Sequence, residues 1–279
     1  MPKLHAQLAI SSRSFHRQLS RRRVALEQLP GAVREIGLGA LEIDDVYLQA
    51  RSPLLRIGGA LFMRRYFGKG VFFREYTSQR LLALHEAFQQ AGTRLVAWSA
   101  NTDFTLVDKP ARWQMHYLEG AIATADDFGA RLVCIRSGGS EQPGPDEMSR
   151  CSEGLKLAAD LAGHFHTRLA LVAGRGAGIA ASAERTLQLL QAVNPPALGV
   201  CLRLDGSDCL ALAPQAIHLQ ATARTFDARG SEPDIDYQAG ISALADAGYA
   251  GWISIDYAGR DAPVCGIMQT AELIASQIN

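Results

Sequence analysis

The sequence of 279 residues has no excess of charge of either sign, because 28 lysines and arginines balance 28 aspartates and glutamates. A neutral chain has no net field that would attract nucleic acid or an anionic membrane surface. The sequence has no apolar run of about 18 residues, so we expect no membrane-spanning helix. Its polar, basic start is unlike a signal peptide. We therefore predict a cytoplasmic protein with no nucleic-acid or membrane partner.

Cysteine is scarce and irregularly placed. The five cysteines are odd in number and show neither a CxxC pair nor the sequence spacing of a zinc site. This pattern favours buried free thiols in a reducing compartment. A chain of this length buries a large core without covalent cross-links, and we find no internal repeat or interdomain linker. The sequence thus predicts one domain that spans residues 1–279.

Eight short apolar segments alternate with helical patterns along the chain. Such segments are typical of parallel strands buried on both faces. Eight of them in alternation with helices favour an α/β fold, a single (β/α)8 TIM barrel. The sixth crossover leaves room for only a short turn. The predicted strands are Gln7–Ser11, Ala40–Ile43, Leu95–Trp98, Leu132–Ile135, Leu169–Val172, Leu198–Leu202, Ala216–Leu219 and Gly251–Ile255.

The helices between these strands show the apolar spacing of one buried face. Apolar residues recur at helical intervals within 81–88, 115–125 and 267–278. Prolines favour the first turn of a helix, so we expect Pro110 and Pro145 to open the third and fourth helices. The glycine-rich stretch from Gly174 to Gly178 is either a strand-to-helix turn or a phosphate cradle.

One connection is longer than a compact barrel needs. Residues 46–78 follow the second strand and carry six basic residues interleaved with aromatic and apolar ones. Long loops in compact domains are commonly functional or disordered, and the aromatic content argues against disorder. The segment is predicted to act as a lid over an anionic substrate, or else as a small helix on the barrel rim or a contact in a homo-oligomer.

Polar residues collect at the predicted carboxyl ends of the strands, where TIM barrels place their catalytic groups. Acids, a histidine and arginines that converge there could bind a divalent metal or a sugar phosphate. The candidates are Glu42 on the second strand, Arg136 on the fourth, Arg203 and Asp205 on the sixth, His218 and Arg224 on and after the seventh, and Asp256 on the eighth.

Several of these segments resemble the xylose-isomerase-like sugar phosphate isomerases and epimerases. The stretch 125–136 is similar to the family's helix ending in A-x-x-L-G-A, which leads into a strand ending in R-x-x-G-G. The segment from Ile36 to Glu42 resembles its second strand, and the one from Leu244 to Tyr257 its closing unit. His218, with Arg224 downstream, resembles its seventh strand. The similarity covers nearly the whole chain except the loop after the second strand.

The resemblance implies four metal ligands, on strands five to eight: Glu, Asp, His and Glu. In this sequence Val172 or Ala173 stands at the first position and Arg203 at the second, unless a two-residue shift brings in Asp205. His218 is kept, and Asp256 replaces the last glutamate. A manganese, magnesium or zinc ion would have His218, Asp256 and at best Asp205. Because a hard cation needs several oxygen donors, we expect metal to be weakly bound or absent.

The sequence supports two interpretations of function. The first is an isomerase- or epimerase-like enzyme in which Asp256 or His218 is the acid/base. Glu42, Arg136, Arg203 and Arg224 would then bind a small polyhydroxylated, anionic substrate. The second is a non-catalytic barrel that binds a ligand or a partner.

Some alternatives remain open for single residues. His218 could instead be a structural residue, and Arg136 could pair with Glu42 or Asp103 at the rim. The family's DNA-repair branch needs a His-rich multi-zinc site and a basic groove. The seven histidines and the neutral charge of this chain argue against that branch.

Overall fold

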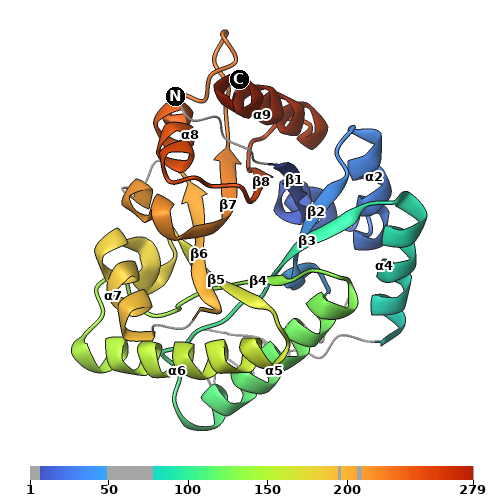
Figure 1. The fold of residues 1–279 in the computed structure, drawn as a ribbon. Coiled ribbons are helices and arrows are strands. Elements are labelled where there is room, and N and C mark those ends of the chain that lie inside the picture. The colour runs from blue at the N-terminus through green and yellow to red at the C-terminus, as the bar shows by residue number, and fades with distance from the viewer. Residues whose placement is uncertain (1–6, 49–77, 194–195, 206–208, 279) are drawn as a thin grey trace.

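The protein forms a closed barrel of eight parallel strands in the order β1-β2-β3-β4-β5-β6-β7-β8 (Figure 1). The computed structural model describes residues 7–48, 78–193, 196–205 and 209–278. The last strand pairs with the first, with Gln7 opposite Trp252 and Ile10 opposite Ile255. The predicted α/β class and (β/α)8 TIM barrel are thus confirmed. The segment 46–78 is described only at its two ends, so the predicted lid lies outside the described residues.

All eight predicted strands are present, and β6, β7 and β8 run two or more residues further than predicted. The strands were predicted as apolar runs, and these runs are interrupted by Arg203 on β6, Gln220 on β7 and Asp256 on β8. The side chains of these three residues line an internal cavity. Polar residues continue these strands because their side chains face this cavity and not the packed apolar core. The strands are β1 (Gln7–Ser11), β2 (Ala40–Asp44), β3 (Arg94–Ser99), β4 (Leu132–Ile135), β5 (Arg168–Ala173), β6 (Leu198–Leu204), β7 (Ala216–Ala223) and β8 (Trp252–Tyr257).

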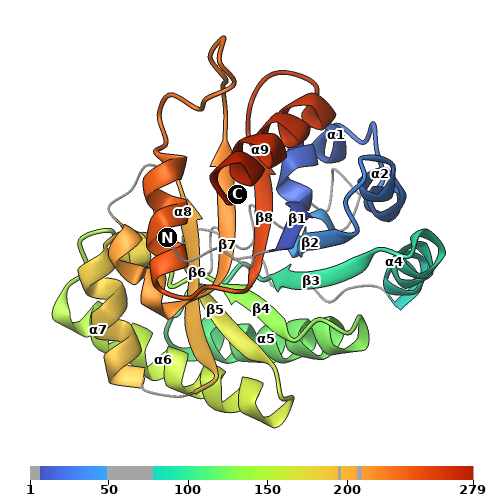
Figure 2. The same cartoon turned by 45° about the horizontal axis from the view of Figure 1, so that its top comes forward.

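Helices surround the barrel on its outer face, as Figure 1 and Figure 2 show from two directions. They are α1 (His16–Ser20), α2 (Leu29–Glu35), α4 (Ser78–Ala91), α5 (Asp108–Asp127), α6 (Pro145–His164), α7 (Ala183–Val193), α8 (Tyr237–Asp246) and α9 (Pro263–Ile278). Short 3-10 turns are η1 (Ser12–Phe15), η2 (Leu26–Gln28), η3 (Asp45–Leu48), η4 (Gly178–Ala181) and η5 (Cys209–Gln215), the last being the short sixth crossover. None of the described helices is long and apolar enough to cross a membrane.

The two predicted helix starts had different outcomes. Helix α6 begins at Pro145, as predicted. Helix α5 begins at Asp108, two residues before Pro110, so that prediction was wrong by a small margin. The N–H groups of a whole first turn lack helical partners, so proline is tolerated at any position there.

Inside the barrel, the side chains change from apolar to polar along the strands. Near the amino ends, Ala9, Ala40 and Val96 form a small apolar cluster with Trp252. Further along, Glu42 and His218 are fully buried. The carboxyl ends then surround the cavity, which is the end of the barrel that carries catalytic groups in TIM-barrel enzymes.

The glycine-rich segment after β5 is a turn packed against neighbouring loops. Gly178 has a φ of 67°, and a Cβ on it would lie 2.1 Å from the carbonyl oxygen of Gly138 in the loop after β4. The N–H of Ile179 donates to that same oxygen at 3.0 Å. Gly176 also has a positive φ, 72°, but a Cβ on it would meet nothing within 4 Å. Of the two sequence-based alternatives, this packing fits the strand-to-helix turn.

The two glycines give a matched test of this packing. Gly176→Ala should destabilise the protein by about 1 kcal/mol, the cost of a left-handed alanine. Gly178→Ala should cost about 3 kcal/mol, because the clash with Gly138 adds to that term. Urea denaturation followed by circular dichroism measures both. Equal losses in the two variants would show that the contact with Gly138 contributes nothing.

Candidate functional site

A cavity of about 600 Å³ opens at the carboxyl ends of the strands. This is a volume suited to a small-molecule ligand. Seven charged side chains line it, four arginines and three aspartates: Arg13, Arg17, Arg136, Arg203, Asp44, Asp256 and Asp261. The cavity therefore has one more formal positive charge than negative.

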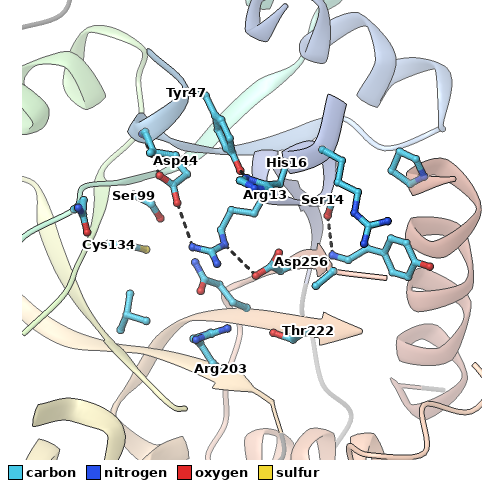
Figure 3. A pocket seen from close by; sticks show the side chains of 18 of the residues that line it. Arg13, Ser14, His16, Asp44, Tyr47, Ser99, Cys134, Arg203, Thr222 and Asp256 are labelled. Carbon is cyan, nitrogen blue, oxygen red and sulfur yellow. Dashed lines mark hydrogen bonds and ion pairs between the residues drawn. The ribbon is translucent and has the colours of Figure 1, made fainter. Parts of the chain in front are cut away.

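Arg13, on the η1 turn directly after β1, is the central cation of the cavity. Its guanidinium lies between two carboxylates (Figure 3), with Nη1 3.4 Å from Asp44 Oδ2 and Nε 3.3 Å from Asp256 Oδ2. Burial alone would lower the pKa of Arg13, but Asp256 and Asp44 outweigh burial and raise it. Arg13 therefore stays charged and holds both acids in place.

Asp256 lies near the carboxyl end of β8 and is the acid best suited to transfer protons. It is 4 % exposed, and burial raises the pKa of its carboxyl, although Arg13 and Arg203 act in the opposite direction. A carboxyl group with a raised pKa is a better proton acceptor than an ordinary one. Perturbed groups in a cleft are candidates for catalysis.

Arg203 on β6 and Arg136, directly after β4, differ in their partners. Arg203 Nη1 donates to the carbonyl oxygen of Arg175 at 2.9 Å and lies 3.8 Å from Asp205 Oδ2. Arg136 forms no ion pair with any described residue; neither Glu42 nor Asp103 neutralises it. Burial, and then the positive charge of Arg13, lower the pKa of Arg136. An unpaired, half-buried guanidinium that faces a cavity is suited to hold an anion.

At the floor of the cavity lies a buried polar cluster of Glu42, Ser99, His218, Gln220 and Ser254, of which Ser99 and Gln220 also line the cavity. Glu42 Oε2 is 2.9 Å from His218 Nε2, and Glu42 Oε1 accepts from Ser99 Oγ at 2.7 Å and from Gln220 Nε2 at 2.6 Å. Burial favours the neutral acid, yet the hydrogen bond from His218 and the other donors lower the pKa of Glu42 to about 2. Glu42 is thus a fixed buried anion.

The structure brings some of the predicted site residues together and separates others. Arg136, Arg203 and Asp256 line the cavity, as expected. Glu42 and His218 were expected to open into it, but both are 0 % exposed and lie in the buried polar cluster. The reason is the strand period of two. Gln220 faces Arg203 across β6 and β7, and His218 lies two residues deeper.

Asp205 and Arg224 also lie outside the cavity lining. The carboxylate of Asp205 accepts from the backbone N–H of Arg175 at 2.8 Å, so it holds the turn after β5. Arg224 is exposed at the start of the segment 224–236, which extends beyond the barrel in both views (Figure 1 and Figure 2). The role in substrate binding that the resemblance implied for Arg224 has no support in this geometry.

Arg13 and Gln220 were not among the site residues predicted from the sequence. Arg13 follows the first strand by two residues, and the rule that polar residues gather at strand ends, applied to β1, points to it. Gln220 is polar within an otherwise apolar strand. That pattern indicates an inward-facing polar position once the strand is known to continue to Ala223.

The closed barrel with a charged cavity at its carboxyl ends is the architecture of TIM-barrel enzymes. A family model described as xylose isomerase-like TIM barrel matches residues 52–205, more than half of the chain. The chain therefore belongs to the xylose isomerase-like TIM barrel family, as the resemblance predicted. No curated protein matches its sequence.

Solved structures share the fold over nearly the whole chain at low sequence identity. An L-ribulose 3-epimerase is 17 % identical with a TM-score of 0.69, over 98 % of this chain and 94 % of that one. The probable 3-DHS dehydratase AsbF of Bacillus anthracis is 15 % identical with a TM-score of 0.67, over 96 % and 98 %. The IolI protein with a bound zinc atom is 15 % identical with a TM-score of 0.68, over 98 % of each chain. Structural neighbours thus include an epimerase, a dehydratase and a zinc-binding protein.

The cavity, called the upper cavity below because His218 and Glu42 lie beneath it, does not contain the four metal ligands that the resemblance implied. Val172 and Arg203 line the cavity at the first two positions. Asp256 is paired with Arg13, and His218 lies below in contact with Glu42. A hard divalent cation needs several oxygen donors, and here it would meet guanidinium groups instead.

The low pKa of Glu42 predicts a loss of stability in acid. Its folded-state pKa of about 2 lies below the ordinary 4.5, so the unfolded chain takes up the proton first. This contribution is complete above the unfolded pKa and is lost as pH falls toward the folded pKa. Glu42→Gln should therefore reduce the pH slope of the unfolding free energy in that window, by up to about 1.4 kcal/mol per pH unit.

Urea midpoints measured in steps from about pH 5 to about pH 2.5 would check the Glu42 prediction. The exposed Glu141 supplies the control, because Glu141→Gln should keep the wild-type slope. If Glu42→Gln also keeps that slope, Glu42 is not held as a buried anion.

Proposed function

We propose that this protein is an isomerase- or epimerase-like enzyme that transfers a proton on a small, polyhydroxylated, anionic substrate such as a sugar phosphate or a sugar acid. The observation that carries the proposal is that two groups line the same cavity: Asp256, a buried acid of raised pKa, and Arg136, whose guanidinium forms no ion pair with a described residue. The xylose isomerase-like family and its epimerase neighbour support the same reaction class.

The anionic character of the substrate follows from charge. Two of the aspartates in the cavity, Asp44 and Asp256, are already paired with Arg13. Arg136 therefore forms no ion pair with a described residue, and the ion pair of Arg203 with Asp205 is long, at 3.8 Å. Because desolvated guanidinium groups bind carboxylate or phosphate oxygens in charge-assisted pairs, an anionic group of the substrate supplies the missing charge.

In the proposed reaction, Asp256 removes a proton from the carbon beside a carbonyl group. The C–H electron pair becomes a carbon–carbon double bond, and the carbonyl π pair moves to oxygen. Arg136 and Arg203 stabilise that oxyanion. Return of the proton to the former carbonyl carbon, with the proton of the adjacent hydroxyl passed to the oxyanion, gives an isomer. Donation of a proton to the original carbon from the opposite face gives an epimer.

We further propose that this upper cavity works without a hard divalent cation such as magnesium or manganese. The support is the donor set, since Val172 and Arg203 occupy positions that would carry carboxylates. The fixed charge of the arginines replaces the cation in binding oxygen atoms of the substrate.

One observation favours a second candidate function, a non-catalytic binding protein. Asp256, the proposed base, is 3.3 Å from Arg13, and an ion pair with a guanidinium makes a carboxylate a weaker base. In that case the cavity would bind the same anionic ligands without turning them over.

Solvent exchange distinguishes the two functions even when the product is unidentified. The protein is incubated in deuterated water with a panel of aldose phosphates, ketose phosphates and sugar acids, and deuterium uptake beside the carbonyl is followed by proton NMR. We expect exchange with an anionic member, lost in Asp256→Asn. Arg13 lowers the pKa of Asp256, so Arg13→Met should move the acid limb of the rate to higher pH. Binding without exchange would support the non-catalytic function.

Ligand-induced thermal shifts test the anion site on its own. Arg136→Met should weaken binding of the best phosphorylated or acidic sugar by about 30-fold, the equivalent of about 2 kcal/mol for a charge-assisted contact. Arg203→Met should weaken it as well. Arg224→Met is the control, because Arg224 lies outside the cavity lining, and it should bind normally. Stabilisation by neutral sugars alone would contradict the proposal.

A further inference from the structure

A second group of polar side chains lies beneath the cavity and takes no part in the proposed reaction. Cys134 on β4, Cys201 on β6 and His218 on β7 are each 0 % exposed. The two cysteine Sγ atoms and a ring nitrogen of His218 all lie within 4.8 Å of one another. Cys201 and His218 are direct neighbours in the pairing of β6 with β7.

His218 is oriented as a metal-binding histidine is. Its Nε2 lies 2.9 Å from the Glu42 carboxylate and 3.1 Å from Ser254 Oγ. Its Nδ1 is buried and has no hydrogen-bond partner among the described residues. Metal-ligating histidines typically donate their other N–H to a carboxylate, which leaves a lone pair on the nitrogen that faces the ion. A buried, unpartnered ring nitrogen otherwise has an energetic cost.

The two thiols face one another but are placed wrongly for a disulfide. Strand β5 lies between β4 and β6, so the two backbones are roughly 9–10 Å apart. A disulfide needs Cα atoms about 4.4–6.8 Å apart. A shared ion, in contrast, would join the sulfurs without a movement of the strands.

The geometry is close to that of a tetrahedral ion. Bond lengths of about 2.3 Å to sulfur and 2.0–2.1 Å to nitrogen put neighbouring ligands about 3.5–3.8 Å apart. The observed limit of 4.8 Å requires side-chain adjustments of about 1 Å or less. Two thiolates and an imidazole favour zinc and similar thiophilic ions, whereas magnesium and manganese prefer oxygen.

We propose that Cys134, Cys201 and Nδ1 of His218 form a binding site for one thiophilic divalent cation of the zinc class, with Glu42 as the carboxylate that orients the histidine. This thiol–imidazole site uses none of the charged side chains of the upper cavity and does not depend on the proposed function. Cys134 lines the cavity together with Ser99, Val172 and Gln220. The fourth coordination position therefore faces the cavity and is open to water.

The test uses the purified full-length protein, stripped with chelator and titrated with Zn²⁺ or Co²⁺. We expect one equivalent of either ion per chain, measured by mass spectrometry of the metal, and a thiolate-to-Co²⁺ charge-transfer band in the near ultraviolet. Cys134→Ser and Cys201→Ser should each weaken zinc binding roughly tenfold or more, because a hydroxyl is a poor ligand for this ion. Glu42→Gln should weaken it about 10- to 100-fold through His218.

Control variants separate this site from other positions in the molecule. Cys151→Ser, at another buried cysteine, and Cys265→Ser, at an exposed one, should bind zinc normally. Asp256→Asn should do so too, because Asp256 belongs to the upper cavity. Loss of zinc in Asp256→Asn alone would place the metal in the cavity and overturn the proposal.

X-ray absorption of the zinc-loaded wild-type protein gives an answer that needs no variant. We expect two sulfur neighbours at about 2.3 Å with nitrogen or oxygen completing the shell. A shell of nitrogen and oxygen only, or no stoichiometric zinc after titration, would overturn the proposal. In that case Cys134 and Cys201 would simply be small apolar side chains that fill the barrel.

Discussion

Every second residue of each strand in a closed barrel must point into a narrow shared interior, and this constraint governs the rest of the structure. Eight strands meet there, so side chains that are distant in sequence become neighbours at each level. Apolar residues fill the amino end. Polar residues fill the levels above, and each of them needs a partner because little water reaches it. The buried polar cluster and the cavity are two successive solutions to that one requirement.

The two buried acids of the interior show how strongly the level decides chemistry. Glu42 is surrounded by donors from His218, Ser99 and Gln220, and these keep it ionised despite complete burial. Asp256, one level higher, has chiefly Arg13 to oppose its burial, and its pKa is raised. The two environments therefore shift the pKa values of these acids in opposite directions. Such divergence separates a structural carboxylate from one that can exchange protons.

The sequence was sufficient for the fold and for part of the site. Short apolar runs located all eight strands, because parallel strands buried on both faces have few alternatives. The same criterion ended β7 too early, at Leu219, because the inward residues beyond it are polar. The depth of His218 in the barrel could not be predicted from the sequence either. A sequence gives the order of residues along a strand, but the register between strands decides which level each side chain occupies.

The two cysteines of the proposed metal site also could not be recognised as neighbours from the sequence. In sequence, Cys134 and Cys201 are 67 positions apart and match no zinc spacing. In the barrel they face one another across β5, beside His218. Spacing rules describe ions bound by one or two local loops. A closed sheet instead assembles ligands from strands that are remote along the chain, so only the three-dimensional register reveals them.

Arg13 has a consequence for how the molecule is assembled. It follows the first strand, and its two carboxylate partners come from β2 and β8. The pair with Asp256 therefore spans nearly the entire chain and forms only when the last strand closes against the first. Until then Arg13 has only the counter-charge of Asp44. Contacts between such remote residues form late, because a long loop must close first. The charged centre of the cavity is thus completed in the same step that closes the barrel. A chain that lacks β8 cannot form the Arg13–Asp256 pair.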